Sequence, residues 1–237
     1  IMASLYLIRH GQASFGSANY DQLSALGQRQ ADVSGHFFAE VELHFGQAVS
    51  GDLSRQQETG QRVLASQPEP ADLRTDPRLN EVDNEGQIAA LLPILCEQDA
   101  DFAERVKAGR GDSKHYQKVI QAVFNAWVSP DCPPLGGTAS WLDYLAGVRG
   151  ALEEAMEQAE SGSDTAIFTS GGTIATAVSW VLGVPHHQIY GFYEPVFNCS
   201  ITRLIFSRGR VSLSNFNDTA HLQLLSQQLG EALVTYR

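Results

Sequence analysis

The sequence has few cysteines, no long hydrophobic run and fewer basic than acidic side chains. Its three cysteines, Cys96, Cys132 and Cys199, are widely spaced and form no CxxC pair. An odd number of scattered cysteines is typical of free thiols in a reducing compartment, so we expect a cytoplasmic protein. The longest apolar stretches, around residues 88–96 and 174–184, are too short or too interrupted to span a bilayer, and no membrane binding is expected.

The shortage of basic side chains also restricts the partners. Sixteen Lys and Arg residues stand against 27 Asp and Glu residues, which gives a formal net charge of −11. This sign disfavours non-specific binding to nucleic acid or to anionic membranes. It would also repel an anionic substrate at long range, so a phosphate site would need a local positive pocket. Hydrophobic residues make up 43% of the 237 residues, which excludes a disordered chain and is ample for a folded core.

Short apolar runs alternate with helical patterns along the chain. The predicted strands are 4–8, 48–50, 73–75 and 165–169, followed by a hairpin of 201–206 and 211–215. The predicted helices of the main fold are 24–45, 53–64, 140–161 and 172–182. This alternation predicts a three-layer α/β fold, with a mainly parallel sheet flanked by helices and an antiparallel edge near the C-terminus.

The pattern changes between about residues 82 and 134. Two further helices are predicted there, at 88–104 and 116–128, before a stop that is rich in proline and glycine. We interpret this block as a helical cap insertion over the main sheet, within a single domain that spans 1–237.

Polar residues follow successive predicted strands, where ligands bind in sheets of this kind. These residues are Arg9, His10, Gly11, Gln12, Arg55, Glu81, Ser170, Gly171 and Gly172. Two guanidinium groups match phosphate oxygens, and backbone N–H groups at a glycine-rich helix start add anion-binding donors. A neutral His10 can attack phosphorus, and Glu81 can protonate the leaving oxygen. Each residue alone is more typical of a surface or structural role, but their joint placement favours a phosphate site.

Five segments of the sequence resemble, in order, the motifs of the histidine phosphatase superfamily, also called phosphoglycerate-mutase-like. They are 7–12 (LIRHGQ), 24–31 (SALGQRQA), 52–59 (DLSRQQET), 79–81 (LNE) and 168–174 (FTSGGTI). The resemblance implies a phosphoglycerate-mutase-like fold, a nucleophile at His10 and a proton donor at Glu81. It also implies that Arg9 and Arg55 bind phosphate and take part in catalysis, and that the cap shapes substrate choice.

One position departs from the family pattern. Ser170 stands where the family has a second histidine that contacts the phosphoryl oxygens, and a serine offers a shorter, uncharged donor. Losing one preorganised donor typically costs about 10²–10³ in rate. Three alternatives follow: a slower phosphatase, replacement of the lost cation by another group such as His221, or ligand binding without turnover. Ser170 and Gly171 remain candidate phosphate ligands, and Gln12, Ser14 and His221 are further possible site residues.

We therefore expect a phosphomonoester hydrolase that acts on a small phosphorylated metabolite through a phosphohistidine. The alternatives are a phosphate-ligand binding protein and a phosphoglycerate-mutase-type phosphotransferase. A mutase grips a second anionic group, for which the cap offers Arg105, Lys107, Arg110, Lys114 and Lys118, but these residues also fit a solvated helix face. The histidines lack metal-ligand spacing such as HExxH, so we expect no metal and no other cofactor. The sequence indicates neither the substrate nor the oligomeric state.

Overall fold

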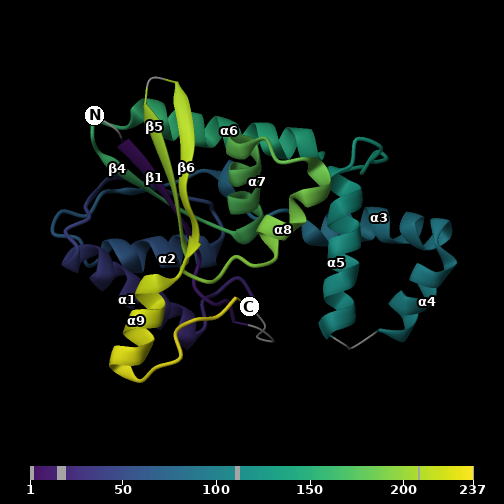
Figure 1. Ribbon diagram of the computed structural model, residues 1–237, viewed down its shortest axis with the longest axis horizontal. Coiled ribbons are helices and arrows are strands. Elements are labelled where there is room, and N and C mark those ends of the chain that lie inside the picture. The colour runs from purple at the N-terminus through teal and green to yellow at the C-terminus, as the bar shows by residue number, and fades with distance from the viewer. Residues whose placement is uncertain (1–2, 15–19, 110–112, 208, 237) are drawn as a thin grey trace.

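The computed structural model describes residues 3–14, 20–109, 113–207 and 209–236. At its centre is a six-stranded sheet with the strand order β3-β2-β4-β1-β5-β6 (Figure 1). The strands are β1 (Ala3–Arg9), β2 (Phe45–Ser50), β3 (Leu73–Thr75), β4 (Asp164–Thr169), β5 (Ile201–Ser207) and β6 (Arg210–Asp218). The first four are parallel, and β5 and β6 add an antiparallel edge next to β1. The predicted α/β sheet with a C-terminal antiparallel edge is confirmed.

Helices cover both faces of this sheet because its strands bury apolar side chains on both sides. In β1, Tyr6 and Ile8 face one core while Leu5 and Leu7 face the other, as the two-residue period of a strand requires. The helices of the first face are α1 (Ala25–Glu40), α2 (Ser54–Leu64) and α9 (Ala220–Leu229). Those of the second face are α6 (Trp141–Gln158) and α7 (Gly171–Leu182). The result is the three-layer arrangement expected from the sequence.

A group of helices stands to one side of the sheet (Figure 1). These helices are α3 (Asn84–Gln98), α4 (Ala100–Ala108) and α5 (Ser113–Val128), and they follow the short helix η1 (Pro77–Leu79). Their own apolar core includes Leu91, Phe124 and Trp127, together with Ile189, which follows η2 (His186–Gln188), and Tyr190 of α8 (Tyr190–Tyr193). The segment after α7 therefore packs against the helical block and links it to the rest of the chain.

The predicted boundaries were wrong at two places. The single helix predicted over 88–104 is divided at Asp99, whose side chain accepts a hydrogen bond from Phe102 N at 2.9 Å and so begins α4. The helix predicted over 24–45 ends at Glu40, and Glu42 turns into the left-handed region at φ 57°. Phe45 instead begins β2, where its ring packs 5.2 Å from that of Phe38. No helix in the described ranges is long and apolar enough to cross a membrane.

Candidate active site

The candidate site lies where β1, β2 and β4 end. His10 follows β1, and its backbone N–H donates to Thr169 O at 2.9 Å, at the end of β4. The next turn passes very close to the start of α1: a Cβ atom on Gly11 would lie 2.4 Å from Gly27 O. A Cβ atom on Gly27 would lie 2.1 Å from Gln12 O. Glycine at both positions therefore allows the loop after His10 to rest against α1.

The hydrogen bonds of His10 define the state of its ring. Its Nδ1 lies 2.7 Å from Gly11 O, and its Nε2 lies 3.2 Å from Nε of Arg55. A carbonyl oxygen only accepts and a guanidinium only donates, so Nδ1 carries the proton and Nε2 presents a lone pair. Burial lowers the pKa of His10 well below its usual value, and the charges of Arg9 and Arg55 lower it further. The imidazole is thus held neutral, with Nε2 directed toward Arg55.

Arg55 is fixed by an acidic residue that was not among the predicted site residues. Its Nη1 forms an ion pair with Oδ1 of Asp21 at 2.8 Å, and its side chain is only 11% exposed. The same carboxylate accepts a hydrogen bond from Ser54 N at 2.8 Å, at the first residue of α2. The ring of Tyr20 lies 5.7 Å from the guanidinium carbon of Arg55. Arg55 therefore points at His10 with one nitrogen while another is held by Asp21.

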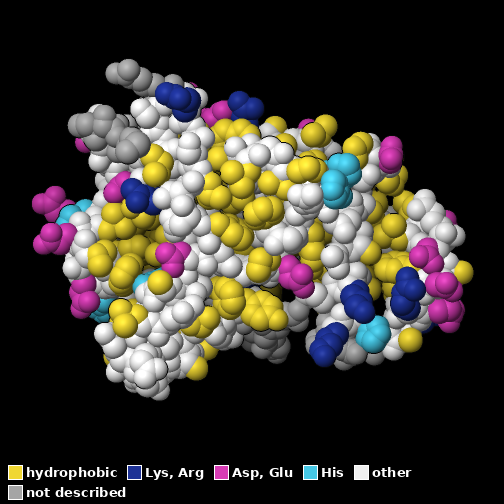
Figure 2. All heavy atoms as spheres, viewed as in Figure 1, with side chains coloured by type: hydrophobic (Ala, Val, Ile, Leu, Met, Phe, Trp, Pro, Cys, Tyr) yellow, Lys and Arg dark blue, Asp and Glu magenta, His cyan; other side chains and the backbone are white. Residues whose placement is uncertain are grey.

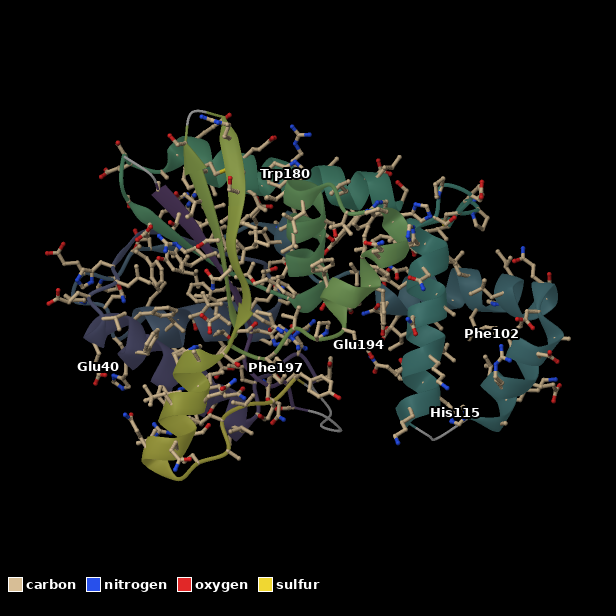
Figure 3. The ribbon with its side chains drawn as sticks, viewed as in Figure 1. Glu40, Phe102, His115, Trp180, Glu194 and Phe197 are labelled. Atoms are coloured by element: carbon tan, nitrogen blue, oxygen red, sulfur yellow. The ribbon has the colours of Figure 1, made fainter. Side chains whose placement is uncertain are left out.

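Arg9 comes from the last position of β1, and its side chain contacts the C-terminal segment. Its Nη1 donates to Val196 O and, at 3.0 Å, to Tyr236 O. The ring of Phe197, labelled in Figure 3, packs against that of Tyr236 at 5.8 Å between centroids. The Arg9 Nε atom is buried and has no hydrogen-bond partner among the described residues. Arg9 acts on His10 and Glu81 through its charge: it adds to the lowering of the pKa of His10 by burial, and it opposes part of the rise that burial causes in the pKa of Glu81.

Glu81 reaches the site from the segment after η1. Its Oε1 accepts hydrogen bonds from Val82 N at 3.0 Å and from Gly172 N at 2.9 Å, near the start of α7. Burial raises the pKa of Glu81, while these two N–H groups and the charges of Arg55 and Arg9 partly oppose the shift. Both bonds use the same oxygen, so Oε2 is the atom that can carry a proton.

Ser170 is the residue after β4, and it is fully buried. Its Oγ accepts a hydrogen bond from Nε2 of Gln56 at 2.8 Å, and the same amide nitrogen donates to Leu79 O at 3.1 Å. Gln56 follows Arg55 on α2 and is also fully buried. Gly171 is the first residue of α7. The N–H of the next residue, Gly172, was expected as an anion-binding donor, and it already donates to Glu81. Helix α2 therefore supplies adjacent side chains to His10 and to Ser170.

The two further loop candidates make hydrogen bonds within the loop and with α1. The side-chain oxygen of Gln12 accepts from Ser24 Oγ at 2.9 Å, and its backbone N–H donates to Oε1 of Gln30 at 2.9 Å. Ser14 donates its backbone N–H to Gln22 O at 2.8 Å. These bonds hold the loop after His10 in place.

His221 lies in the core between α9 and α1. Its Nε2 is 3.1 Å from Ser34 Oγ, and its ring centroid is 5.0 Å from that of Phe37. The structure does not bring it into hydrogen-bond contact with His10, Arg9 or Arg55. Burial lowers its pKa to about 4.

Two polar residues support the backbone around His10 and were not singled out in the sequence. Thr59 Oγ1 accepts from Gly11 N at 3.0 Å, and Nδ2 of Asn198 donates to His10 O at 3.2 Å. Thr59 lies within the third motif segment, so its position in that segment was a usable signal. Asn198 had none, because it belongs to a loop far along the chain. Within the described ranges, no group of three or more His, Cys, Asp or Glu side chains is arranged to hold a metal ion.

The fold is an α/β fold of the phosphoglycerate mutase type, as structural comparison shows. The family model of the histidine phosphatase superfamily (branch 1) matches residues 5–90 and 86–219. The chain therefore belongs to the histidine phosphatase superfamily, branch 1. A search of curated proteins found no match.

Several solved structures share the fold at low sequence identity. A phosphoglycerate mutase from Bacillus anthracis str. Sterne is 18% identical with a TM-score of 0.67, over 94% of this chain and 96% of that chain. A phosphoserine phosphatase from Entamoeba histolytica, in complex with 3-phosphoglyceric acid, is 20% identical with a TM-score of 0.62, over 93% and 99%. A mycobacterial glucosyl-3-phosphoglycerate phosphatase is 22% identical with a TM-score of 0.62, over 92% and 100%.

Proposed function

We propose that this protein is a phosphomonoester hydrolase that acts on a small phosphorylated metabolite through a phosphohistidine on His10. The observation that carries this proposal is the state of the His10 ring, with its proton on Nδ1 toward Gly11 O and its Nε2 lone pair 3.2 Å from Arg55 Nε. A nucleophile needs this lone pair, and the guanidinium beside it is a ready phosphate ligand. The names of two structural relatives, both phosphatases of small metabolites, favour the same class of substrate.

In the first step, Nε2 of His10 attacks the phosphorus while the phosphorus–oxygen ester bond breaks. Arg55, and Arg9 through its charge and buried Nε, stabilise the negative charge on the transferring phosphoryl oxygens. The leaving oxygen takes a proton from Oε2 of Glu81. The raised pKa of Glu81 favours the acid form that this step requires.

In the second step, a water molecule attacks the phosphohistidine. The Glu81 carboxylate accepts a proton from this water, the nitrogen–phosphorus bond breaks, and inorganic phosphate and neutral His10 are formed. One carboxyl group thus acts as acid in the first step and as base in the second, which returns the site to its starting state.

We propose that Ser170 serves as a neutral donor at the position where the family has its second histidine. Support comes from the Gln56 amide, which fills one acceptor position of Ser170 Oγ and leaves the hydroxyl proton available to a phosphoryl oxygen. An uncharged donor predicts slower turnover than a cation would give. The contacts of His221 with α1 favour a structural role, and we assign it no part in the reaction.

We favour hydrolysis over a mutase reaction because basic residues of the proposed cap have acidic neighbours within the cap itself. For this cap we keep the limits of about 82–134. Figure 2 shows Lys and Arg side chains gathered near the end of the helical block where α4 and α5 approach each other. Lys107 forms an ion pair with Glu104 at 3.0 Å, and Arg105 lies 3.8 Å from Asp99, so both have acidic neighbours within the block. Arg110 lies outside the described residues.

The free cysteines, Cys96, Cys132 and Cys199, support the proposed cytoplasmic location.

The test is turnover of para-nitrophenyl phosphate and of a panel of phosphorylated metabolites, with and without EDTA. We expect EDTA-insensitive release of phosphate, acid-labile phosphate trapped on the protein by rapid quench, and loss of both in His10→Ala. Turnover equal in the wild type and in His10→Ala would refute the mechanism. Thermal stabilisation by phosphorylated ligands without any turnover would instead favour the binding-protein alternative.

A further inference from the structure

A carboxylate stands within the group of cations that the proposed reaction needs. Asp21 accepts hydrogen bonds from Arg55 Nη1 at 2.8 Å and from Ser54 N at 2.8 Å, with a longer contact from Arg55 N at 3.4 Å. Its side chain is one-third exposed, at 33%, so it reaches the solvent-accessible side of Arg55. Asp21 is thus bound as an external anion would be bound, by a guanidinium and by N–H groups at the start of a helix.

This arrangement divides the donors of Arg55 between two partners. Nε faces His10, where the transferred phosphoryl group would bind, and Nη1 faces Asp21. Because the Asp21 carboxylate already occupies Nη1 and Ser54 N, a second anionic group of a substrate finds these donors taken. It also meets a negative charge at the place where it would otherwise be attracted.

We propose that Asp21 is a specificity-determining residue that selects phosphomonoesters whose leaving group carries no second negative charge beside Arg55. This inference rests on the proposed phosphatase function and narrows its substrate class. Asp21 acts through Arg55 and through its own charge, without contact with the transferred phosphoryl group. The substrate class is therefore phosphomonoesters whose alcohol part is neutral or cationic, in preference to phosphorylated carboxylic acids and bisphosphates.

A matched substrate pair tests this directly. Glycerol 3-phosphate and 3-phosphoglycerate differ by a hydroxymethyl group in place of a carboxylate. In the wild type, kcat/KM should favour glycerol 3-phosphate. In Asp21→Asn, the ratio of the two kcat/KM values should fall about tenfold, mainly through a lower KM for 3-phosphoglycerate, because one repulsive charge is lost in a partly solvated site. Asp21→Glu keeps the charge and should keep most of the wild-type preference.

The control is Asp32→Asn. Asp32 pairs with Arg62 at 3.2 Å between α1 and α2, and its side chain is 38% exposed. This variant removes the same formal charge from a similar ion pair away from His10, and it should leave the ratio unchanged. A purely structural role of Asp21 would lower activity toward both substrates together and leave the ratio as it is. That outcome, or an equal change in Asp32→Asn, would overturn the proposal.

Binding measurements separate this proposal from the phosphatase proposal. In a His10→Ala background, calorimetry gives the dissociation constants of the same two ligands without any turnover. The ratio of these constants should again shift about tenfold on Asp21→Asn. If Asp21→Asn does not fold, Asp21→Ser takes its place in both assays. Its hydroxyl is a shorter, uncharged acceptor for the N–H of Ser54 at the start of α2. An unchanged ratio in a protein that hydrolyses phosphomonoesters would remove Asp21 from specificity and leave the hydrolase in place.

Discussion

Replacing His221 by phenylalanine should make the protein less sensitive to acid while leaving its activity intact. His221 is only 4% exposed, and its Nε2 bonds to Ser34 Oγ at 3.1 Å. The Ser34 hydroxyl proton is already donated to Gln30 O at 2.8 Å, so Nε2 must be the donor to Ser34 Oγ. The acceptor Nδ1 is then left buried and without a partner among the described residues. A ring with no polar atom should tolerate this place well.

The size of the effect follows from proton linkage. Burial lowers the pKa of His221 from 6.5 to about 4 in the folded chain. Between these values the unfolded chain binds a proton that the folded chain does not, so stability falls as the pH falls from 6.5 toward 4. Each unit of pKa difference corresponds to about 1.4 kcal/mol, which gives a loss of about 2 kcal/mol from this group between pH 7 and pH 5.

The measurement is urea unfolding of the wild type and of His221→Phe at both pH values. The variant should lose about 2 kcal/mol less than the wild type on acidification. His10, whose pKa is also lowered, contributes to both proteins and cancels in the difference. His36, exposed on α1, gives the control His36→Gln, which should behave as the wild type. Equal acid sensitivity of His221→Phe and wild type would refute the reasoning, and lost hydrolysis in a folded variant would return His221 to the site.

Further expectations concern Glu81 and the close contact after His10. Glu81→Gln should lower kcat about 10²–10⁴-fold for alkyl phosphates, and much less for para-nitrophenyl phosphate, whose leaving group needs little protonation; equal losses for both would remove Glu81 as the acid. Gly27→Ala should destabilise the protein by about 1–3 kcal/mol in urea unfolding, because its Cβ would lie 2.1 Å from Gln12 O. At Gly147, which lies within α6, a Cβ atom would be 3.8 Å from the nearest atom, on the side chain of Arg78. Gly147→Ala should therefore stabilise the protein by about 0.5–1 kcal/mol. Similar changes in unfolding free energy for the two variants would contradict the close contact of Gly27 with Gln12.

Local patterns predicted the main elements of the fold. The apolar run of β1, the strand before Ser170 and the hairpin of β5 and β6 all occur near their expected positions. Helix starts were readable where a capping side chain marks them: Ser24 Oγ accepts from Gly27 N at 3.0 Å at the start of α1. The division at Asp99 was missed although Asp99 is itself a capping residue, because the apolar pattern continues on both sides of it. Helix α9, within 220–229, was missed as well.

The candidate site could be predicted only in part. Residues that follow strands were readable as candidates because parallel strands bring their carboxyl ends to one edge of a sheet. His10, Arg55 and Glu81 were predicted in this way, and α2 and α7 hold the latter two beside the end of β1. The ion pair of Asp21 with Arg55 depends on a contact across 34 positions of the chain, and no local pattern marks it.

The sequence by itself determined the class of fold, the order of the motifs and the residue types available for chemistry. These follow from periodicity and from local hydrogen bonding, which act over a few residues. Only the tertiary structure decided which ring nitrogen of His10 carries the proton and which oxygen of Glu81 accepts the backbone hydrogen bonds. It also decided that His221 packs into the core and that Asp21 joins the site. Each of these depends in part on partners that are distant in the chain, such as Arg55 for His10 and Gly172 for Glu81, and on the exclusion of water. Both arise only when the layers pack together.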